Sequence, residues 1–228
     1  ARAAERRPLI QIANLLDTSN SMDGLIAQAK THLWSIVNEF ATAKQDGVRP
    51  QLEVALFEYG NDGLPANEGY VRQVLGLTTD LDKVSEELFA LRTNGGSEWC
   101  GWVIRDAAKV LSWSANNSDF KAIFIAGNEP FTQGSVDYVE ACKAAIAKGI
   151  IVNTIHCGDR ATGVNTKWEH GAHLADGSYS HIDQNRVVAQ ITAPQDAEIA
   201  KLNAELNDTY VFYGKRGQEA KVRQEAQD

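Results

Sequence analysis

The sequence LDTSNSMDG, residues 16–24, follows an apolar run at residues 9–16 that is typical of a buried strand. It has neither the glycines of a dinucleotide-binding turn nor the Gly-Lys-Ser/Thr of a phosphate-binding loop. Instead it carries a carboxylate and two hydroxyls at alternate positions, Asp17, Ser19 and Ser21. A turn at a strand end can aim these oxygens at one point. Such hard ligands favour Mg²⁺, Mn²⁺ or Ca²⁺ over zinc.

Outward from this loop, strand-like and helix-like segments alternate along the chain. Thr79 and Asp82 have the spacing of a capping box at the start of the second helix. Strands separated by helices of this length pair in parallel through right-handed crossovers. We therefore predict an α/β fold of three αβα layers, with a doubly wound, mostly parallel six-stranded sheet. Strands are expected at 9–16, 52–59, 70–75, 121–126, 150–155 and 179–182, and helices at 22–40, 81–91, 99–113, 135–149 and from 194 through 206.

The composition excludes several classes of protein. The 228 residues are 43% hydrophobic and 23% charged, which is typical of a globular chain rather than a disordered one. The longest uninterrupted run of apolar residues and glycine, at 122–127, is far shorter than the roughly 20 residues of a membrane span. The net charge of −8 argues against a nucleic-acid scaffold. We expect a basic arm at 1–7, one domain at 8–213 and a helical or frayed tail at 214–228.

The three cysteines form no recognisable metal or redox motif, because no two of them have CxxC spacing. Cys142 falls on the apolar face of a predicted helix and is expected in the core. Spacing alone leaves open whether Cys100 and Cys157 pair in an oxidising compartment.

The motif DTSNSM, residues 17–22, resembles the signature of the von Willebrand factor A (VWA) domain and its metal-ion-dependent adhesion site. The resemblance covers residues 8–192 and continues in the family's order at LTTDL (77–81), GGS (95–97) and the strand IFI (123–125). It implies a Rossmann-like VWA fold and a non-enzymatic binding module. In such a module, the bound ion keeps an open position for an acidic side chain of a protein partner.

The resemblance also assigns metal ligands. Asp17, Ser19 and Ser21 match the family's first metal-binding loop, and Ser97 stands where the family usually has Thr. A serine hydroxyl can ligate in the same way as the threonine hydroxyl. Mg²⁺ is the expected ion, with Mn²⁺ and Ca²⁺ as alternatives.

The last metal-binding element departs from the family pattern. Where the family places Asp-Gly after the hydrophobic strand, this chain has Gly127 in the position of the Asp. Glu98, beside Ser97, and Glu129, two residues after Gly127, are candidates for the missing carboxylate. With Asp17 as the only direct carboxylate, the ion keeps a net positive charge and attracts an external acid strongly. A second carboxylate makes the site neutral.

Two other functions remain open at this stage. One is a metal-assisted hydrolase that uses Glu98, Glu129 and His156 on the same rim, although no nucleophile elbow or HExxH motif is present. The other is an ion-free scaffold in which the Asp and Ser residues only cap the first helix. Trp99 is expected to present an exposed indole to a partner.

Three further expectations concern single residues and location. Glu58, at the end of the second strand, is expected in solvent at the rim, and His170 and His173 in a solvated Gly-rich loop. The motifs GGSEWCG (95–101) and AGNEP (126–130) look like a little-described bacterial branch of the family that is typically predicted to be exported. The chain is therefore expected to be periplasmic or extracellular.

Overall fold

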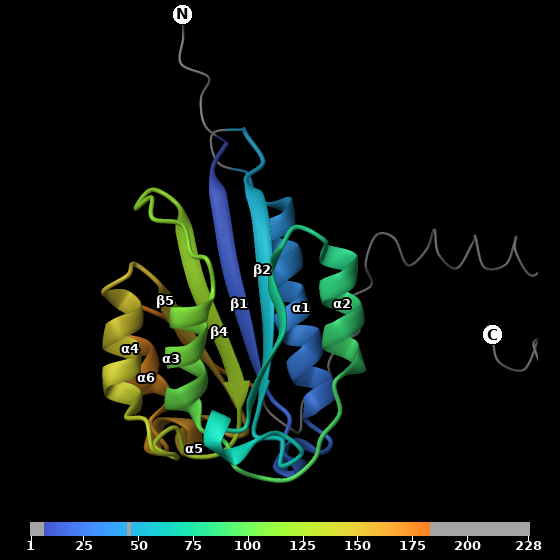
Figure 1. Ribbon diagram of the computed structural model, residues 1–228, viewed down its shortest axis with the longest axis vertical. Helices are drawn as coiled ribbons and strands as arrows, with labels where there is room; N and C mark the ends of the chain where they lie inside the picture. The colour runs from blue at the N-terminus through green and yellow to red at the C-terminus, as the bar shows by residue number, and fades with distance from the viewer. Residues whose placement is uncertain (1–6, 45–46, 183–228) are drawn as a thin grey trace, which may run out of the picture. The chain divides into compact units, whose positions relative to one another are not determined.

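The computed structural model describes residues 7–44 and 47–182, which form a sheet with helices on both faces (Figure 1). The first six residues, the predicted helix from 194, the end of the predicted domain at 213 and the tail at 214–228 lie outside the described residues. No helix in the described part of the chain is long and apolar enough to cross a membrane.

The sheet has six strands in the order β3-β2-β1-β4-β5-β6. Strand β3 pairs antiparallel with β2, and every other neighbouring pair is parallel. The prediction of a doubly wound, mostly parallel α/β sheet is therefore confirmed. The strands are β1 (Leu9–Asp17), β2 (Gln51–Tyr59), β3 (Val71–Thr78), β4 (Phe120–Gly127), β5 (Ile151–Cys157) and β6 (Tyr179–Ile182).

The helices differ from the predicted ones by up to four residues at their starts and up to three at their ends. The first begins four residues late, because residues 20–22 form a separate 3-10 turn and Gly24 has a φ of +81°. Two short helices after β5 were not predicted, since six residues are too few to show an apolar period. The α-helices are α1 (Ile26–Thr42), α2 (Leu81–Ala90), α3 (Cys100–Val110), α4 (Tyr138–Ile146), α5 (Arg160–Asn165) and α6 (Trp168–His173). A second 3-10 turn covers Ala66–Glu68.

Strand β1 is mostly apolar, with Gln11, Asn14 and Asp17 as its polar residues, because it is covered on both faces. Ala13 and Leu15 belong to the core cluster under α3 and α4, whereas Ile12 and Leu16 face the residues of α1 and α2. Because successive strand residues point to opposite faces, a strand that is covered on both sides has no polar face. Figure 1 shows α1 and α2 on one side of the sheet and α3 and α4 on the other.

The position of β1 explains where a ligand would gather. It lies between β2 and β4. The chain adds β2 and β3 on one side of β1 and then adds β4, β5 and β6 on the other side. Ligands of open α/β sheets bind outside the carboxyl ends of the strands at this reversal point. Asp17 is the last residue of β1 and therefore stands at that point.

The cysteines are free and buried, and Cys142 lies in the core as predicted. His170 and His173 are exposed as expected, but they belong to α6 rather than to a loop. The His170 ring also lies against Tyr138, with Nδ1 2.9 Å from the phenol oxygen.

The capping residue of α2 is Asp80 rather than Thr79. The Asp80 carboxylate accepts a hydrogen bond from the backbone N–H of Lys83 at 3.0 Å. We predict that Asp80→Ala lowers the free energy of unfolding by about 1 kcal/mol, the usual cost of losing an N-cap. Thr79→Ala is the control and should leave it within about 0.5 kcal/mol. Urea denaturation measures both, and an equal loss in the two variants would contradict the assignment of the cap.

Candidate metal centre at the end of the first strand

Asp17 is completely buried at the end of β1. Its Oδ1 accepts the backbone N–H of Ser19 at 2.8 Å, but its Oδ2 is buried without a hydrogen-bond partner. Burial raises the pKa of Asp17 to about 7, because desolvation disfavours the charged form, and the nearby Glu98 charge acts in the same direction. The Ser19 hydroxyl and the Asn128 backbone lie close enough to lower the pKa in part, but neither makes a well-formed hydrogen bond to Oδ2.

Two serine hydroxyls stand beside this carboxylate. The Oγ atoms of Ser19 and Ser21 are 2.9 Å apart, with Ser19 buried and Ser21 exposed. Asn128 holds Ser21 from the loop after β4: its Oδ1 accepts the serine hydroxyl at 2.9 Å, and its Nδ2 donates to the Ser21 carbonyl at 2.9 Å. Sequence reasoning missed Asn128 as a residue that positions the loop.

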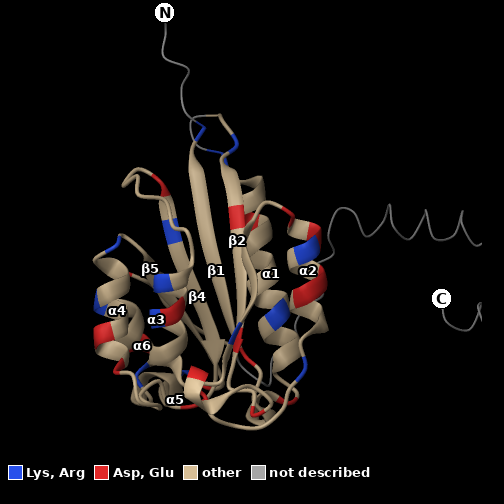
Figure 2. Ribbon diagram, in the orientation of Figure 1, with Lys and Arg blue, Asp and Glu red and all other residues tan. Residues whose placement is uncertain are grey.

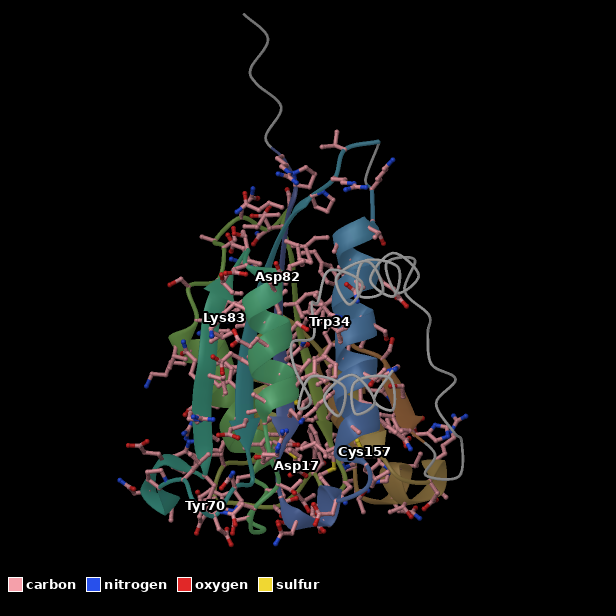
Figure 3. The ribbon with its side chains drawn as sticks, turned by 90° about the vertical axis from the view of Figure 1, so that its right-hand side faces the viewer. Asp17, Trp34, Tyr70, Asp82, Lys83 and Cys157 are labelled. Atoms are coloured by element: carbon pink, nitrogen blue, oxygen red, sulfur yellow. The ribbon has the colours of Figure 1, made fainter. Side chains whose placement is uncertain are left out.

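The loop before α3 packs against the loop after β1. The backbone N–H of Asn20 donates to the Gly95 carbonyl at 2.6 Å, and that of Asn94 donates to the Thr18 carbonyl at 2.8 Å. An isolated antiparallel bridge joins Ser97 to Gly60, the residue that follows β2. Three loops that are distant in sequence thus meet at one end of the sheet. Figure 3 shows Asp17 at this end, with Asp82 toward the opposite one.

The side chains of Asp17 and Glu98 come close together at Gly60. A Cβ added to Gly60 would lie 2.9 Å from Asp17 Oδ1, 3.0 Å from Glu98 Cγ and 3.5 Å from Ser19 Cβ. Its φ of +80° also favours glycine. Glu98 is only 4% exposed, and burial raises the pKa of its carboxyl group. The structure therefore brings Glu98 close to Asp17 and Ser19.

Tyr59 accounts for the unusual glycine at the end of β4. A Cβ added to Gly127 would lie 2.4 Å from the Tyr59 hydroxyl oxygen and 3.0 Å from Asp17 Oδ2. That hydroxyl donates to the Ala126 carbonyl at 3.1 Å. The tyrosine thus fills the space in which an aspartate side chain would begin. Sequence reasoning missed it, although parallel pairing of β1 with β2 places Tyr59 opposite Asp17.

Glu129 has other partners than Asp17. Its Oε2 accepts the Gln133 side-chain amide at 3.3 Å, and its backbone carbonyl accepts the Trp168 indole N–H at 2.9 Å. Of the two glutamates considered for the missing carboxylate, Glu98 is the one that lies against the serine loop at Gly60.

The prediction that His156 lies on the rim is wrong. Its side chain is buried, with an exposed fraction of 1%, and its ring packs against Trp168 with centroids 5.8 Å apart. Its Nε2 lies 3.3 Å from the Asn128 carbonyl, to which it donates, and Nδ1 has no hydrogen-bond partner among the described residues. Burial lowers the pKa of the imidazole. The histidine packs behind the loop after β4.

The expectation of a solvated Glu58 is also wrong. Glu58 is buried, and its Oε1 lies 2.6 Å from Arg72 Nε, while its Oε2 accepts the Thr18 hydroxyl at 3.4 Å. Arg72 comes from β3, whose antiparallel register with β2 sets the two residues side by side. Glu58 therefore ties the loop after β1 to the edge of the sheet.

Trp99 is half-buried rather than fully exposed. It precedes α3 and packs edge-on against Tyr70, with ring centroids 5.3 Å apart, and against Trp102 at 5.6 Å. These three rings form an aromatic cluster beside Glu98. Part of the Trp99 indole still reaches solvent.

The donor set at Asp17 is unlike that of a zinc or thiolate site. Within the described ranges, no three His, Cys, Asp and Glu side chains are grouped so that they could hold a metal ion. The side-chain oxygens beside Asp17 are the hydroxyls of Ser19 and Ser21. Hydroxyl and carboxylate oxygens are ligands of hard cations.

Comparison with known proteins relates this arrangement to solved structures. No family model matches the chain, and no curated protein matches it. The conserved hypothetical protein BatB from Bacteroides thetaiotaomicron is 20% identical, with a TM-score of 0.58 over 86% of this chain and 99% of its own. The SpRpn10 VWA domain is 14% identical, with a TM-score of 0.58 over 79% and 91% of the two chains. The chain has a VWA fold.

A third match adds a metal-bearing example of the VWA fold. Proximal thread matrix protein 1 from the mussel byssus, in a structure with a zinc-occupied MIDAS motif, is 12% identical, with a TM-score of 0.57. The alignment covers 86% of this chain and 46% of that protein. Identities this low show the fold alone. The predicted resemblance to VWA domains is thereby confirmed as a resemblance of fold, and positions 183–192 of the predicted range lie outside the described residues.

The fit of Gly127 against Tyr59 can be tested by a double-mutant cycle. We predict that Gly127→Ala lowers the free energy of unfolding by about 1–3 kcal/mol, because the new methyl group overlaps the phenol oxygen. Tyr59→Phe, combined with Gly127→Ala, should restore at least about 1 kcal/mol of that loss. Urea unfolding of the two single variants and the double variant measures the coupling. Strictly additive losses would show that the tyrosine does not exclude a side chain at position 127.

Proposed function

We propose that this VWA domain binds a divalent cation at Asp17, Ser19 and Ser21 and uses the ion to engage an acidic group of a protein partner. One observation carries the proposal: Asp17 Oδ2 is buried without a hydrogen-bond partner. A buried carboxylate oxygen without a partner costs free energy, and a cation removes that cost. The hydroxyl oxygens of Ser19 and Ser21, which are 2.9 Å apart, would supply two further ligands beside this carboxylate.

The donor set favours Mg²⁺, with Mn²⁺ and Ca²⁺ as alternatives, because all its ligands are oxygens. Ser97 remains a proposed ligand, since its backbone is paired with Gly60 at the point where Asp17 and Glu98 meet. When bound, the ion would supply an electrophilic centre with an open position for an incoming oxygen. The chain's own residues hold and orient that centre.

Glu98 is the proposed second carboxylate. It lies against Asp17 and Ser19 at Gly60, and its burial keeps it close to them. An ion between Asp17 and Glu98 is nearly neutral, so the partner's carboxylate would bind by completing the coordination more than by net charge. Trp99 would contact the partner beside this position, because its indole is partly open to solvent. Export of the protein stays a prediction.

A substitution at Asp17 separates metal binding from folding. We predict that wild-type protein binds Mg²⁺ or Mn²⁺ and that ion at 100 times its Kd adds about 2.7 kcal/mol to the free energy of unfolding. Asp17→Asn should abolish both effects. The metal-free variant should be at least as stable as wild type at pH 8, because a neutral amide replaces a buried charge. Titration calorimetry and thermal unfolding measure the two quantities.

The matched control is Asp23→Asn. Asp23 belongs to the same loop, but its carboxylate is exposed and accepts the Thr93 hydroxyl, so its removal should not change the affinity for the ion. Unchanged metal affinity in Asp17→Asn would refute the site. If Mg²⁺, Mn²⁺ and Ca²⁺ all fail to bind the wild type, the metal site is refuted and the result favours the ion-free scaffold.

The open position can be tested with a simple carboxylate. On protein loaded with Mn²⁺, acetate should displace a bound water and lower the paramagnetic relaxation of water protons, as a partner's acidic side chain would do. Acetamide, which has the same shape without the charge, is the control and should have a much smaller effect. An unchanged relaxation rate at saturating acetate would show that the ion has no position for an acidic partner.

A further inference from the structure

The end of the sheet opposite Asp17 contains a hollow of about 380 Å³. It lies between the carboxyl ends of α3 and α4, the loop at 111–115 and the first residues of β4. Lys109, Lys121 and Lys148 line it, and we call it the lysine hollow. Figure 2 shows basic positions on α3, on β4 and at the same end of α4.

Lys121 is the buried charge in the lysine hollow, with an exposed fraction of 4%. Its Nζ donates to the Ser114 carbonyl at 3.1 Å and to the Lys148 carbonyl at 2.8 Å. An ammonium group has three donors, so one remains for another acceptor. Gly149 borders this group, and a Cβ added there would lie 3.4 Å from Nζ, so the glycine keeps that side free of a side chain.

The hollow carries more positive charge than the protein around it balances. Neither Lys109, Lys121 nor Lys148 lies within 4 Å of a carboxylate oxygen in the described part of the chain. The partial negative charges at the carboxyl ends of α3 and α4 each offset roughly half of one positive charge. Asp119, near Lys121, accepts the Ser114 hydroxyl at 2.5 Å and offsets one more. Lys121 is buried and Lys109 and Lys148 are exposed around it, while Asp119 has a further interaction besides Ser114, so the hollow is basic on balance.

An apolar wall faces these amines. The half-buried Trp113 ring lines the hollow together with Leu111 and Ala108, and its indole N–H donates to the Ala107 carbonyl at 3.0 Å, which fixes the ring. A hollow of this volume matches small-molecule sites, which combine apolar walls with a few placed polar groups. The ligand that fits both sides has an anionic head and a flat apolar body.

We propose that the lysine hollow binds a small phosphate monoester whose apolar group lies against Trp113. A phosphate monoester carries a charge of roughly −1.5 to −2 near pH 7, more than a monocarboxylate, and lysine binds phosphate as a point charge. The free donor of Lys121 would take one phosphate oxygen, and Lys148 and Lys109 would lie around the others. This site does not depend on the ion at Asp17.

The test uses phenyl phosphate, with titration calorimetry and tryptophan fluorescence on the full chain. Phenyl phosphate should bind at millimolar or lower concentration, more tightly than inorganic phosphate or benzoate, and binding should weaken with added salt. Lys109→Met and Lys148→Met should each weaken it about tenfold, the effect of losing one charged contact. Lys121→Met should abolish it, with circular dichroism to confirm that the variant folds.

Lys143→Met is the matched control. Lys143 is exposed on α4, pairs with Glu140 at 3.6 Å and lies outside the hollow, so its loss should leave the affinity unchanged. Lys109 is exposed in the last turn of α3, so Lys109→Met tests the charge with little effect on the fold. No binding of phenyl phosphate, or equal affinities in Lys109→Met, Lys148→Met and wild type, would overturn the proposal. Binding no tighter than that of inorganic phosphate would overturn the role of Trp113.

Discussion

Water is excluded from the carboxyl end of β1, and the arrangement of the whole site depends on this. Strands β2 and β4 flank that end, and three loops close over it, so the Asp17 carboxylate is completely buried. The Ser19 backbone N–H satisfies one oxygen, and the other has no hydrogen-bond partner. A charge in such a place is unfavourable unless a cation balances it. The cation that we propose at this end of the sheet would remove that cost.

Close packing then decides where a second carboxylate can stand. Gly60 and Gly127 both approach Asp17 so closely that neither position has room for a side chain. At position 127 the obstacle is the Tyr59 phenol, which comes from the neighbouring strand β2. Glu98 reaches the same region from the start of α3, past Gly60. The loss of an acid after β4 and the presence of one before α3 are thus two consequences of one packing arrangement.

The fold could be predicted because its central strands are mostly apolar and its four longer helices have a clear period, both of which are local properties. The loop of Asp17 was predictable for the same reason, since it follows the first buried strand. The burial of Glu58 and His156 was not, because it depends on contacts made across the fold. Arg72, which pairs with Glu58, is 14 residues away on an antiparallel strand, and Trp168, which covers His156, lies on a helix too short to show a period.

Helix α3 runs from one end of the sheet to the other, and its dipole acts on the charged residues at both ends. It starts one residue after Trp99, beside Glu98, and ends at the lysine hollow, because it runs antiparallel to the strand β4 that follows it. Its amino end carries a partial positive charge, and its carboxyl end a partial negative one. Carboxylates at the first end and lysines at the second both complement that dipole. The same polarity that lets the protein bury Asp17 and Glu98 near the amino end of α3 therefore also lets it bury Lys121 near the other end. Each end keeps a charge that its own helix only partly offsets, and the cation and the phosphate monoester proposed above would balance these charges.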